Sequence, residues 1–176
     1  MISAKYKCAI AIALVTCGGS GVALLFSIAM VTSGSMSPTL KPKQHVLVVR
    51  ISPLRSLCPV MFVPCFHRGD LVILQGPHGK THVVKRIVAL SGDRVHIKEG
   101  LLFLNGSAAY ESYAYHKSVY LRERDEWPQG ASEREITIPT NMLFVMGDNR
   151  SESTDSRIWG PVPISDVIGK VILRLP

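Results

Sequence analysis

Hydrophobic residues are distributed unevenly along this chain. Residues 8–31 form a run of 24 positions without a charged side chain, whereas beyond residue 38 hydrophobic residues come in short runs between polar turns. A helix of that length is ~36 Å long, which exceeds a hydrocarbon core of about 30 Å. We therefore predict a transmembrane anchor over residues 8–31, behind a short cytoplasmic N-terminus over residues 1–7. A cleaved secretory signal is the alternative, with Lys5 and Lys7 as its basic region, but its hydrophobic part usually spans only about 7–15 residues.

The short hydrophobic runs predict strands. They are rich in β-branched residues and are bounded by glycine, proline, asparagine or aspartate, and no good amphipathic helix lies among them. The expected strands cover residues 45–51, 71–74, 81–90, 94–98, 101–104, 136–138, 143–146 and 167–175. This pattern indicates a mostly β domain over residues 32–176, with an antiparallel sheet that is barrel-like or a sandwich. Residues 107–134 are polar with weak periodicity, and we expect a variable excursion there.

Basic residues dominate the first part of the chain. Residues 1–69 hold seven Lys or Arg and no acid, whereas residues 70–176 hold thirteen basic and thirteen acidic residues. A basic segment next to a membrane is attracted to anionic lipid head groups, so we expect membrane lipid as a partner. A nucleic acid partner is not expected, because the predicted β domain is neutral overall. A cytoplasmic N-terminus is favoured only slightly, because basic residues lie on both sides of the anchor: Lys5 and Lys7 before it, and Lys41, Lys43 and Arg50 after it.

Two cysteines bracket the proline-bounded hydrophobic run PVMFVP. Cys58 and Cys65 have no histidine or cysteine at zinc-finger spacing, so we expect no metal. In an oxidising compartment they would close a small disulfide loop, and otherwise they are two thiols. Residues 59–64 either enter the membrane interface or pack on the core; the sequence leaves both questions open.

Lys85 lies on an apolar strand face. Alternation along residues 81–90 places it with Val83, Ile87 and Ala89. Burial disfavours an ammonium and lowers its pKa, so a lysine in this place can be neutral and accept a proton from a hydroxyl group. The alternative is a lysine whose stem packs on the sheet while its charged end reaches water.

A serine-rich stretch, TSGSMSPT, covers residues 32–39. Taken alone, it has the composition of a linker. Its position directly after the predicted anchor would instead hold a nucleophile, Ser35, at the membrane surface. No G-x-S-x-G elbow surrounds Ser35, so we prefer a Ser–Lys dyad to a histidine-dependent site, for which His82 is the best candidate. The polar loop over residues 147–157 supplies groups that can orient the lysine, and Asp155 and Arg157 can pair to brace it.

Four blocks of the chain, in order, resemble the type I signal peptidases, membrane-bound Ser–Lys endopeptidases. The blocks are SGSMSPTL at residues 33–40, RGDLV at 68–72, KRI with GD at 85–87 and 92–93, and the loop over 147–160. Ser91 is a departure, because the family often has proline there. The resemblance implies Ser35 as nucleophile and Lys85 as general base. It also implies that Ser33 donates to the oxyanion, that Ser153 holds the lysine amine, and that Asp155 and Arg157 support the loop.

The expected activity is therefore removal of signal peptides from exported preproteins through an acyl-enzyme, without a cofactor. The substrates would be preproteins with small residues before the cleavage site. The resemblance places the enzyme in the bacterial cytoplasmic membrane, with one span and an extracytoplasmic catalytic domain, and an organellar inner membrane stays open as the alternative location. Two alternatives stay open: a specialised peptidase for conjugation or pilus assembly with the same dyad, and a non-catalytic membrane-anchored envelope β domain.

Overall fold

The computed structural model describes residues 26–51, 66–76, 81–98, 100–115 and 135–176, and these residues form two sheets. The larger sheet has seven strands in the order β1-β2-β11-β3-β4-β9-β10, and the smaller has four in the order β7-β6-β5-β8. Every pairing between these named strands is antiparallel. The prediction of a mostly β, antiparallel fold is confirmed.

The strands of the larger sheet are β1 (Phe26–Met30), β2 (His45–Arg50), β3 (Leu71–Gln75), β4 (His82–Ala89), β9 (Met142–Met146), β10 (Val162–Pro163) and β11 (Val167–Arg174). The smaller sheet contains β5 (Arg94–Lys98), β6 (Leu101–Leu104), β7 (Ser107–Ala108) and β8 (Ile136–Thr137). Three short helices complete the described part of the chain: η2 (Arg150–Glu152), α4 (Ser156–Trp159) and η3 (Ile164–Asp166).

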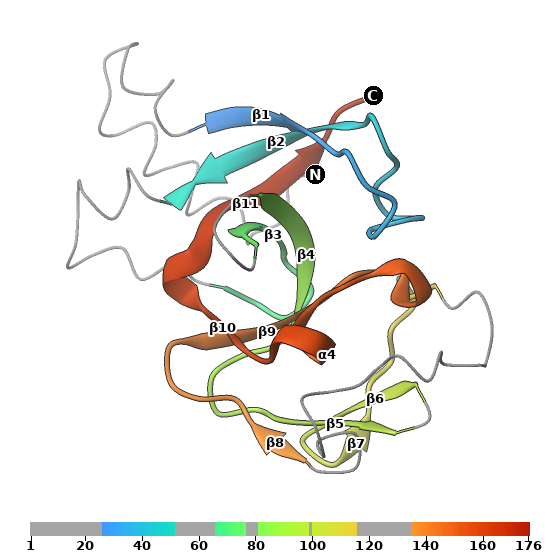
Figure 1. Ribbon diagram of the computed structural model, residues 1–176, viewed down its shortest axis with the longest axis vertical. Helices are drawn as coiled ribbons and strands as arrows, with labels where there is room; N and C mark the ends of the chain where they lie inside the picture. The colour runs from blue at the N-terminus through green and yellow to red at the C-terminus, as the bar shows by residue number, and fades with distance from the viewer. Residues whose placement is uncertain (1–25, 52–65, 77–80, 99, 116–134) are drawn as a thin grey trace, which may run out of the picture.

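The larger sheet curls into a half-barrel (Figure 1). Strands β1, β2 and β11 lie side by side at one end of the molecule, β3 and β4 curve through its middle, and the smaller sheet lies at the other end. The register shifts between Ile87 and Ala89 of β4, and again within β11. Such irregularities bend a strand and increase its twist, which favours a curled sheet over a flat one.

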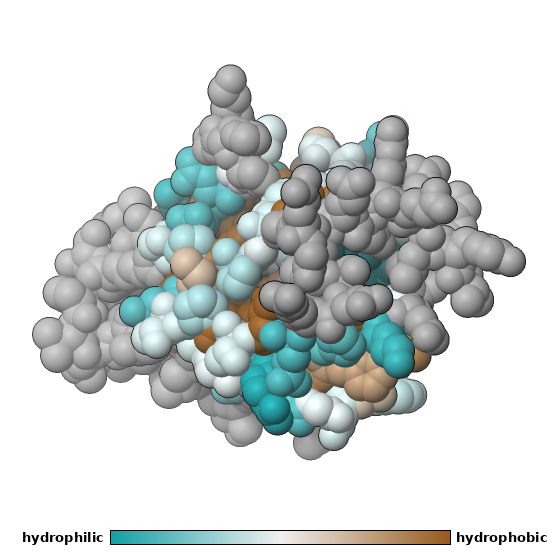
Figure 2. Space-filling view, turned by 60° about the horizontal axis from the view of Figure 1, so that its bottom comes forward, coloured by the Kyte–Doolittle hydropathy of each residue, from teal (hydrophilic) through white to brown (hydrophobic). Residues whose placement is uncertain are grey.

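Three clusters of buried side chains form the core. One contains Val72, Leu74 and Ile87 from β3 and β4, and a second contains residues of both sheets around Phe144. The third, with Met36 and Val48, lies beneath the segment that joins β1 to β2. Seen from the side of the smaller sheet, hydrophobic residues also reach the surface between hydrophilic ones (Figure 2).

Strand β1 corrects the predicted end of the anchor. Residues 26–30 lie inside the span predicted as one transmembrane helix, yet they pair with β2 from Phe26 opposite Val49 to Met30 opposite His45. The prediction of helix is therefore wrong for residues 26–30, and the β domain begins at least six residues earlier than residue 32. The physical reason is that a short apolar run fits a strand as well as a helix, and the free edge of β2 decides between them.

Several other predictions fall outside the described residues. They concern residues 1–25, the pair Cys58 and Cys65, the run over 59–64, and residues 116–134 of the expected excursion. Among the residues that are described, no helix has the length and hydrophobicity needed to cross a membrane.

Candidate active site

Ser35 lies in the turn between β1 and β2. After Ser35, Met36 and Leu40 are completely buried in the core cluster below this turn. Their burial fixes the backbone on the C-terminal side of Ser35. On the N-terminal side, Ser33 Oγ lies 3.2 Å from Ser35 Oγ, and either hydroxyl can be the donor of this hydrogen bond. The Ser35 carbonyl oxygen accepts a hydrogen bond from the backbone N–H of Asn149, with an N to O distance of 3.0 Å. Ser35 is thus held from both sides, and its hydroxyl points toward that of Ser33.

Lys85 is buried in the middle of β4, with only 3% of its surface exposed. It pairs with Val72 of β3, and its Nζ donates to Ser153 Oγ at 2.9 Å. Burial lowers the pKa of Lys85 from 10.5 to about 8; the negative charge of Asp155 opposes this fall, and the positive charge of Arg157 adds to it. The burial expected for Lys85 is therefore observed.

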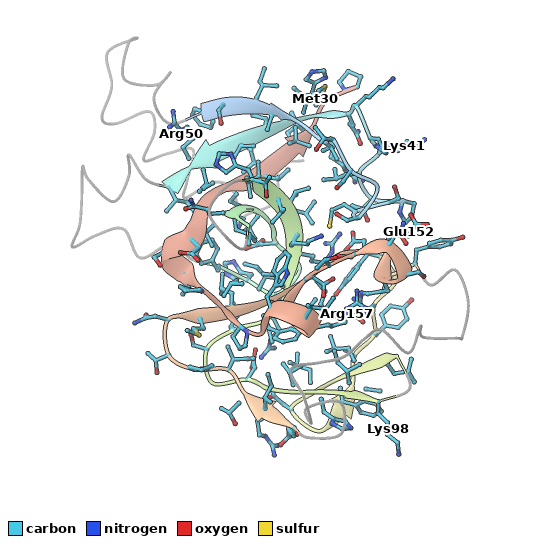
Figure 3. The ribbon with its side chains drawn as sticks, viewed as in Figure 1. Met30, Lys41, Arg50, Lys98, Glu152 and Arg157 are labelled. Carbon is cyan, nitrogen blue, oxygen red and sulfur yellow. The ribbon has the colours of Figure 1, made fainter. Side chains whose placement is uncertain are left out.

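Asp155 organises the loop that follows β9. Its carboxylate is fully buried and accepts hydrogen bonds from Ser153 Oγ at 2.7 Å, from the Gly147 N–H at 2.9 Å and from Arg157 Nε at 2.9 Å. Burial by itself raises the pKa of Asp155, but the hydrogen bonds and the charge of Arg157 hold it below its ordinary value. An ionised Asp155 orients Ser153, so that the Ser153 oxygen faces Lys85 Nζ. In Figure 3, Arg157 marks the α4 end of this loop and Glu152 its η2 end.

Gly147 is the point where the Ser35 turn and the Asp155 loop meet. A Cβ added to Gly147 would overlap the Ser153 side chain and lie 2.6 Å from the Ser35 carbonyl oxygen. No side chain larger than a hydrogen fits there without moving one of these two serines. A glycine at the start of the loop therefore permits the close approach that places Ser35 beside the lysine and its partners.

A buried ion pair lies next to Lys85. Arg86 Nε and Nη2 donate to the two carboxylate oxygens of Asp148 at 2.7 and 2.6 Å, and Arg86 Nη1 donates to the Gly69 carbonyl at 2.8 Å. The pair connects β4, the loop after β9 and the turn before β3. No role was predicted for either residue, although Arg86 lies in the KRI block and Asp148 in the loop over residues 147–160, both of which carry the family resemblance.

The structure thus brings the six predicted site residues into two hydrogen-bonded groups. Ser33 and Ser35 form one, and Lys85, Ser153, Asp155 and Arg157 form the other. The groups meet at Gly147, and among the described residues no hydrogen bond joins Ser35 Oγ directly to Lys85 Nζ. Catalytic hydrogen bonds are often long before substrate binds.

Other groups that could supply chemistry are placed less favourably. His82 lies at the exposed start of β4, opposite Gln75, and not in the hydrogen-bonded groups around Ser35 and Lys85. The part of the chain that the structure describes contains no group of three His, Cys, Asp or Glu residues placed to hold a metal ion.

Comparison with known proteins identifies the family of this chain. The family model "Signal peptidase, peptidase S26" matches residues 3–175. Signal peptidase I P of Bacillus subtilis subsp. natto is 36% identical over 133 residues, which cover 76% of this chain and 67% of that protein. Signal peptidase I U of Bacillus subtilis (strain 168) is 31% identical and covers 83% and 76%, respectively.

Two further similarities extend the comparison. Thylakoidal processing peptidase 1 of Arabidopsis thaliana is 29% identical over 87% of this chain and 44% of its own. The crystal structure of a signal peptidase I from Enterococcus faecalis V583 superposes with a TM-score of 0.50 at 28% identity, over 63% of this chain and all of the other. The family match spans nearly the whole chain, and this chain belongs to the signal peptidase family, peptidase S26.

Proposed function

We propose that this signal peptidase, a serine endopeptidase that removes signal peptides from exported proteins, uses Ser35 as its nucleophile and Lys85 as its general base. The observation that carries the proposal is a lysine buried in β4, with a pKa of about 8, hydrogen-bonded to Ser153 beside the Ser35 turn. At pH 8 about half of these amines are neutral, so a proton acceptor is present under ordinary conditions. Arginine would not serve, because a guanidinium does not lose its proton in proteins.

The reaction follows from these placements. Lys85 takes the Ser35 proton as Ser35 Oγ attacks the scissile carbonyl carbon, and the resulting ammonium then protonates the leaving amine. The same lysine, neutral again, takes a proton from a water molecule that attacks the ester carbonyl, and it returns this proton to Ser35 Oγ as the acyl–oxygen bond breaks, which frees the serine. The Ser33 hydroxyl, 3.2 Å from Ser35 Oγ, is close enough to turn toward the oxyanion that forms on the attacked carbonyl. Ser153 and ionised Asp155 keep the amine in one orientation throughout.

The substrates of this activity are exported preproteins, and the proposed specificity is for small residues before the cleavage site. This specificity rests on family membership, since small side chains are typical of signal peptide cleavage sites. A substrate bound as an extended strand would present its scissile carbonyl to Ser35 in a regular geometry.

The protein is a membrane-associated signal peptidase, and the family members that it matches come from bacteria and from thylakoids. We propose that it lies in the bacterial cytoplasmic membrane, anchored by its uncharged residues before β1, with the β domain on the extracytoplasmic side. The exposed face of β1, β2 and β11 supports contact with lipid, because Ile28 and Leu173 both lie opposite Leu47 and are 64% and 54% exposed.

Charge on the same end of the molecule supports anionic head groups as the lipid partner. Met30, 55% exposed, and the exposed Lys41 both lie in the part formed by β1 and β2, at the end opposite Lys98 (Figure 3). Ile28, Met30 and Leu173 form an apolar strip, and Lys41 lies at the same end of the molecule. This arrangement matches a membrane interface, where hydrocarbon lies just below a layer of negative charge.

The test is cleavage of a purified preprotein by the full-length enzyme in detergent. We expect Ser35→Ala and Lys85→Met to lose activity by a factor of 1000 or more while remaining folded. His82→Ala should retain it, since His82 lies at the exposed start of β4. Activity that survives Lys85→Met and disappears with His82→Ala would instead establish a histidine-dependent hydrolase. Cleavage of one dedicated pro-protein and of no bulk preprotein would favour the specialised peptidase.

A further inference from the structure

The segment directly after β7 holds the loop that contacts the nucleophile. Residues 111–115 lie within residues 107–134, which the sequence pattern describes only as a polar excursion, and they pack against residues 147–150. We name residues 111–115 the clasp segment. None of its residues was expected to matter for the reaction, and two of its side chains, Glu111 and Tyr113, make contacts that a solvent-exposed excursion would not have.

Glu111 pairs with a buried arginine of the loop. Arg150 Nη1 and Nη2 donate to the two Glu111 carboxylate oxygens at 2.7 and 2.5 Å, and the two side chains are only 2% and 9% exposed. Arg150 Nε donates in turn to the Gly147 carbonyl oxygen at 3.0 Å. A bidentate pair of this kind fixes both distance and plane, and a buried guanidinium that loses its carboxylate partner must move or take up water.

Tyr113 links Glu111 to the second buried ion pair. Its hydroxyl donates to Glu111 at 2.9 Å, while the Arg86 guanidinium carbon lies 4.0 Å from the centre of its ring. Burial, together with the negative charge of Glu111, raises the pKa of Tyr113, so the phenol keeps the proton that it donates. One ring thereby supports the Glu111 carboxylate at its edge and covers the Arg86 guanidinium, which itself binds Asp148.

The backbone completes the attachment. Tyr115 N–H donates to the Asp148 carbonyl at 2.7 Å, and Arg150 N–H donates to the Tyr115 carbonyl at 3.0 Å, so that Tyr115 forms a parallel bridge with Asn149. Asn149 is the residue whose N–H holds the Ser35 carbonyl oxygen and whose Nδ2 donates to Gly34 at 3.2 Å. A continuous path of contacts therefore runs from the clasp segment to the nucleophile.

We propose that the clasp segment positions residues 147–150 for catalysis, and that Glu111 and Tyr113 are positioning residues which act through Arg150 and Arg86. The proposal rests on the proposed roles of Ser35 and Lys85. A shift of the loop by a few tenths of an ångström moves Asn149 against Ser35 and Gly147 against Asp155, and so disturbs nucleophile and base together. Because neither Glu111 nor Tyr113 bonds to Ser33, Ser35 or Lys85, their loss should lower kcat with little change in KM.

The test compares Glu111→Gln and Glu111→Asp with a control at a carboxylate of similar burial, Asp93, whose side chain is 9% exposed like that of Glu111. Asp93 is bidentate to Arg68 at the turn between β4 and β5, away from the loop, so Asp93→Asn weakens the fold without touching the clasp. For each full-length variant in detergent we would measure kcat and KM for preprotein cleavage, the melting temperature, and the folded fraction at the assay temperature.

We expect Glu111→Gln to lower kcat at least tenfold with KM within twofold of wild type, and Glu111→Asp to recover part of the loss. Asp93→Asn should lower the melting temperature by at least as much and leave kcat within twofold. Tyr113→Phe keeps the ring over Arg86 and should stay within threefold, whereas Tyr113→Leu should lose tenfold or more. If Glu111→Gln does not fold, Tyr113→Leu carries the test, because it leaves the pair between Glu111 and Arg150 in place.

A kcat of Glu111→Gln within twofold of wild type would overturn the proposal, as would an equal loss of kcat in Asp93→Asn. The Ser35→Ala variant distinguishes a failure of the clasp proposal from a failure of the proposed function. If Ser35→Ala stays active, the assignment of the nucleophile is wrong whatever the clasp variants do. If Ser35→Ala is inactive and Glu111→Gln is fully active, only the clasp is wrong.

Discussion

Replacement of Lys85 by methionine should stabilise the protein at neutral pH while it removes the activity. Methionine keeps the apolar stem that packs in β4 but carries no charge. Burial lowers the pKa of Lys85 from 10.5 to about 8, and a difference of that size is worth about 3 kcal/mol. The methionine side chain also loses the hydrogen bond to Ser153, which costs about 1 kcal/mol. The net expectation at pH 6 is a variant about 2 kcal/mol more stable than the wild type.

The stability difference between Lys85→Met and the wild type should depend on pH. Between pH 8 and 10.5 the unfolded chain binds a proton at Lys85 that the folded protein has released, so wild-type stability rises with pH over this interval. Below pH 8 both states are protonated, and the folded protein carries the full penalty of a buried ammonium. The advantage of Lys85→Met should therefore be constant up to about pH 7 and shrink to nearly zero around pH 9.5.

Guanidinium unfolding of the full-length protein in detergent, at pH 6 and pH 9.5, measures this difference. Trp159 packs against the core cluster around Val72 and Ile87, so its fluorescence reports the unfolding. Lys98→Met is the control, since Lys98 is exposed at the end of β5 and should show no pH-dependent gain. A Lys85→Met variant that is less stable than wild type at pH 6, or whose advantage is the same at both pH values, would refute the reasoning.

Four further outcomes follow from the site. In preprotein cleavage, kcat/KM of the wild type should rise about tenfold per pH unit below pH 8 and level off above it, as the pKa of Lys85 requires; a flat profile would contradict a lysine base. Ser33→Ala should lower kcat about 100- to 1000-fold, the usual effect of one lost oxyanion donor, and unchanged kinetics would exclude Ser33 from that role. Ser153→Ala should lower kcat about tenfold, because one hydrogen bond that orients the amine is lost; the circular dichroism spectrum should stay the same. Gly147→Ala should abolish cleavage, since its Cβ would overlap Ser153. Full activity in a folded Gly147→Ala protein would show that a methyl group fits between Ser153 and the Ser35 carbonyl oxygen.

Strand β1 and the clasp segment show where sequence reasoning ends. The run over residues 26–30 is as apolar as the residues before it, so its pattern favoured a longer anchor, whereas the unpaired edge of β2 makes it a strand. Glu111 and Tyr113 stand in a polar stretch without periodicity, and nothing local distinguishes them from surface residues. Their partners, Arg150 and Arg86, lie 39 and 27 positions away along the chain, and only the packing of the smaller sheet against the loop makes them neighbours.

The sequence by itself determined the local features of this protein. The apolar run around Lys85 was enough to predict its burial, and residues 85–89 of β4 are in fact buried on both faces of the strand. The order of short strands and turns predicted an antiparallel β domain, because short β-branched runs between turn residues are typical of antiparallel sheets. The tertiary structure alone decided which groups meet. Strand β9 pairs with β4 so that the loop after Met146 begins beside Arg86 and Lys85, and no local pattern specifies this pairing. The partners of the buried lysine are therefore set by strand order, a non-local property that depends on the whole core.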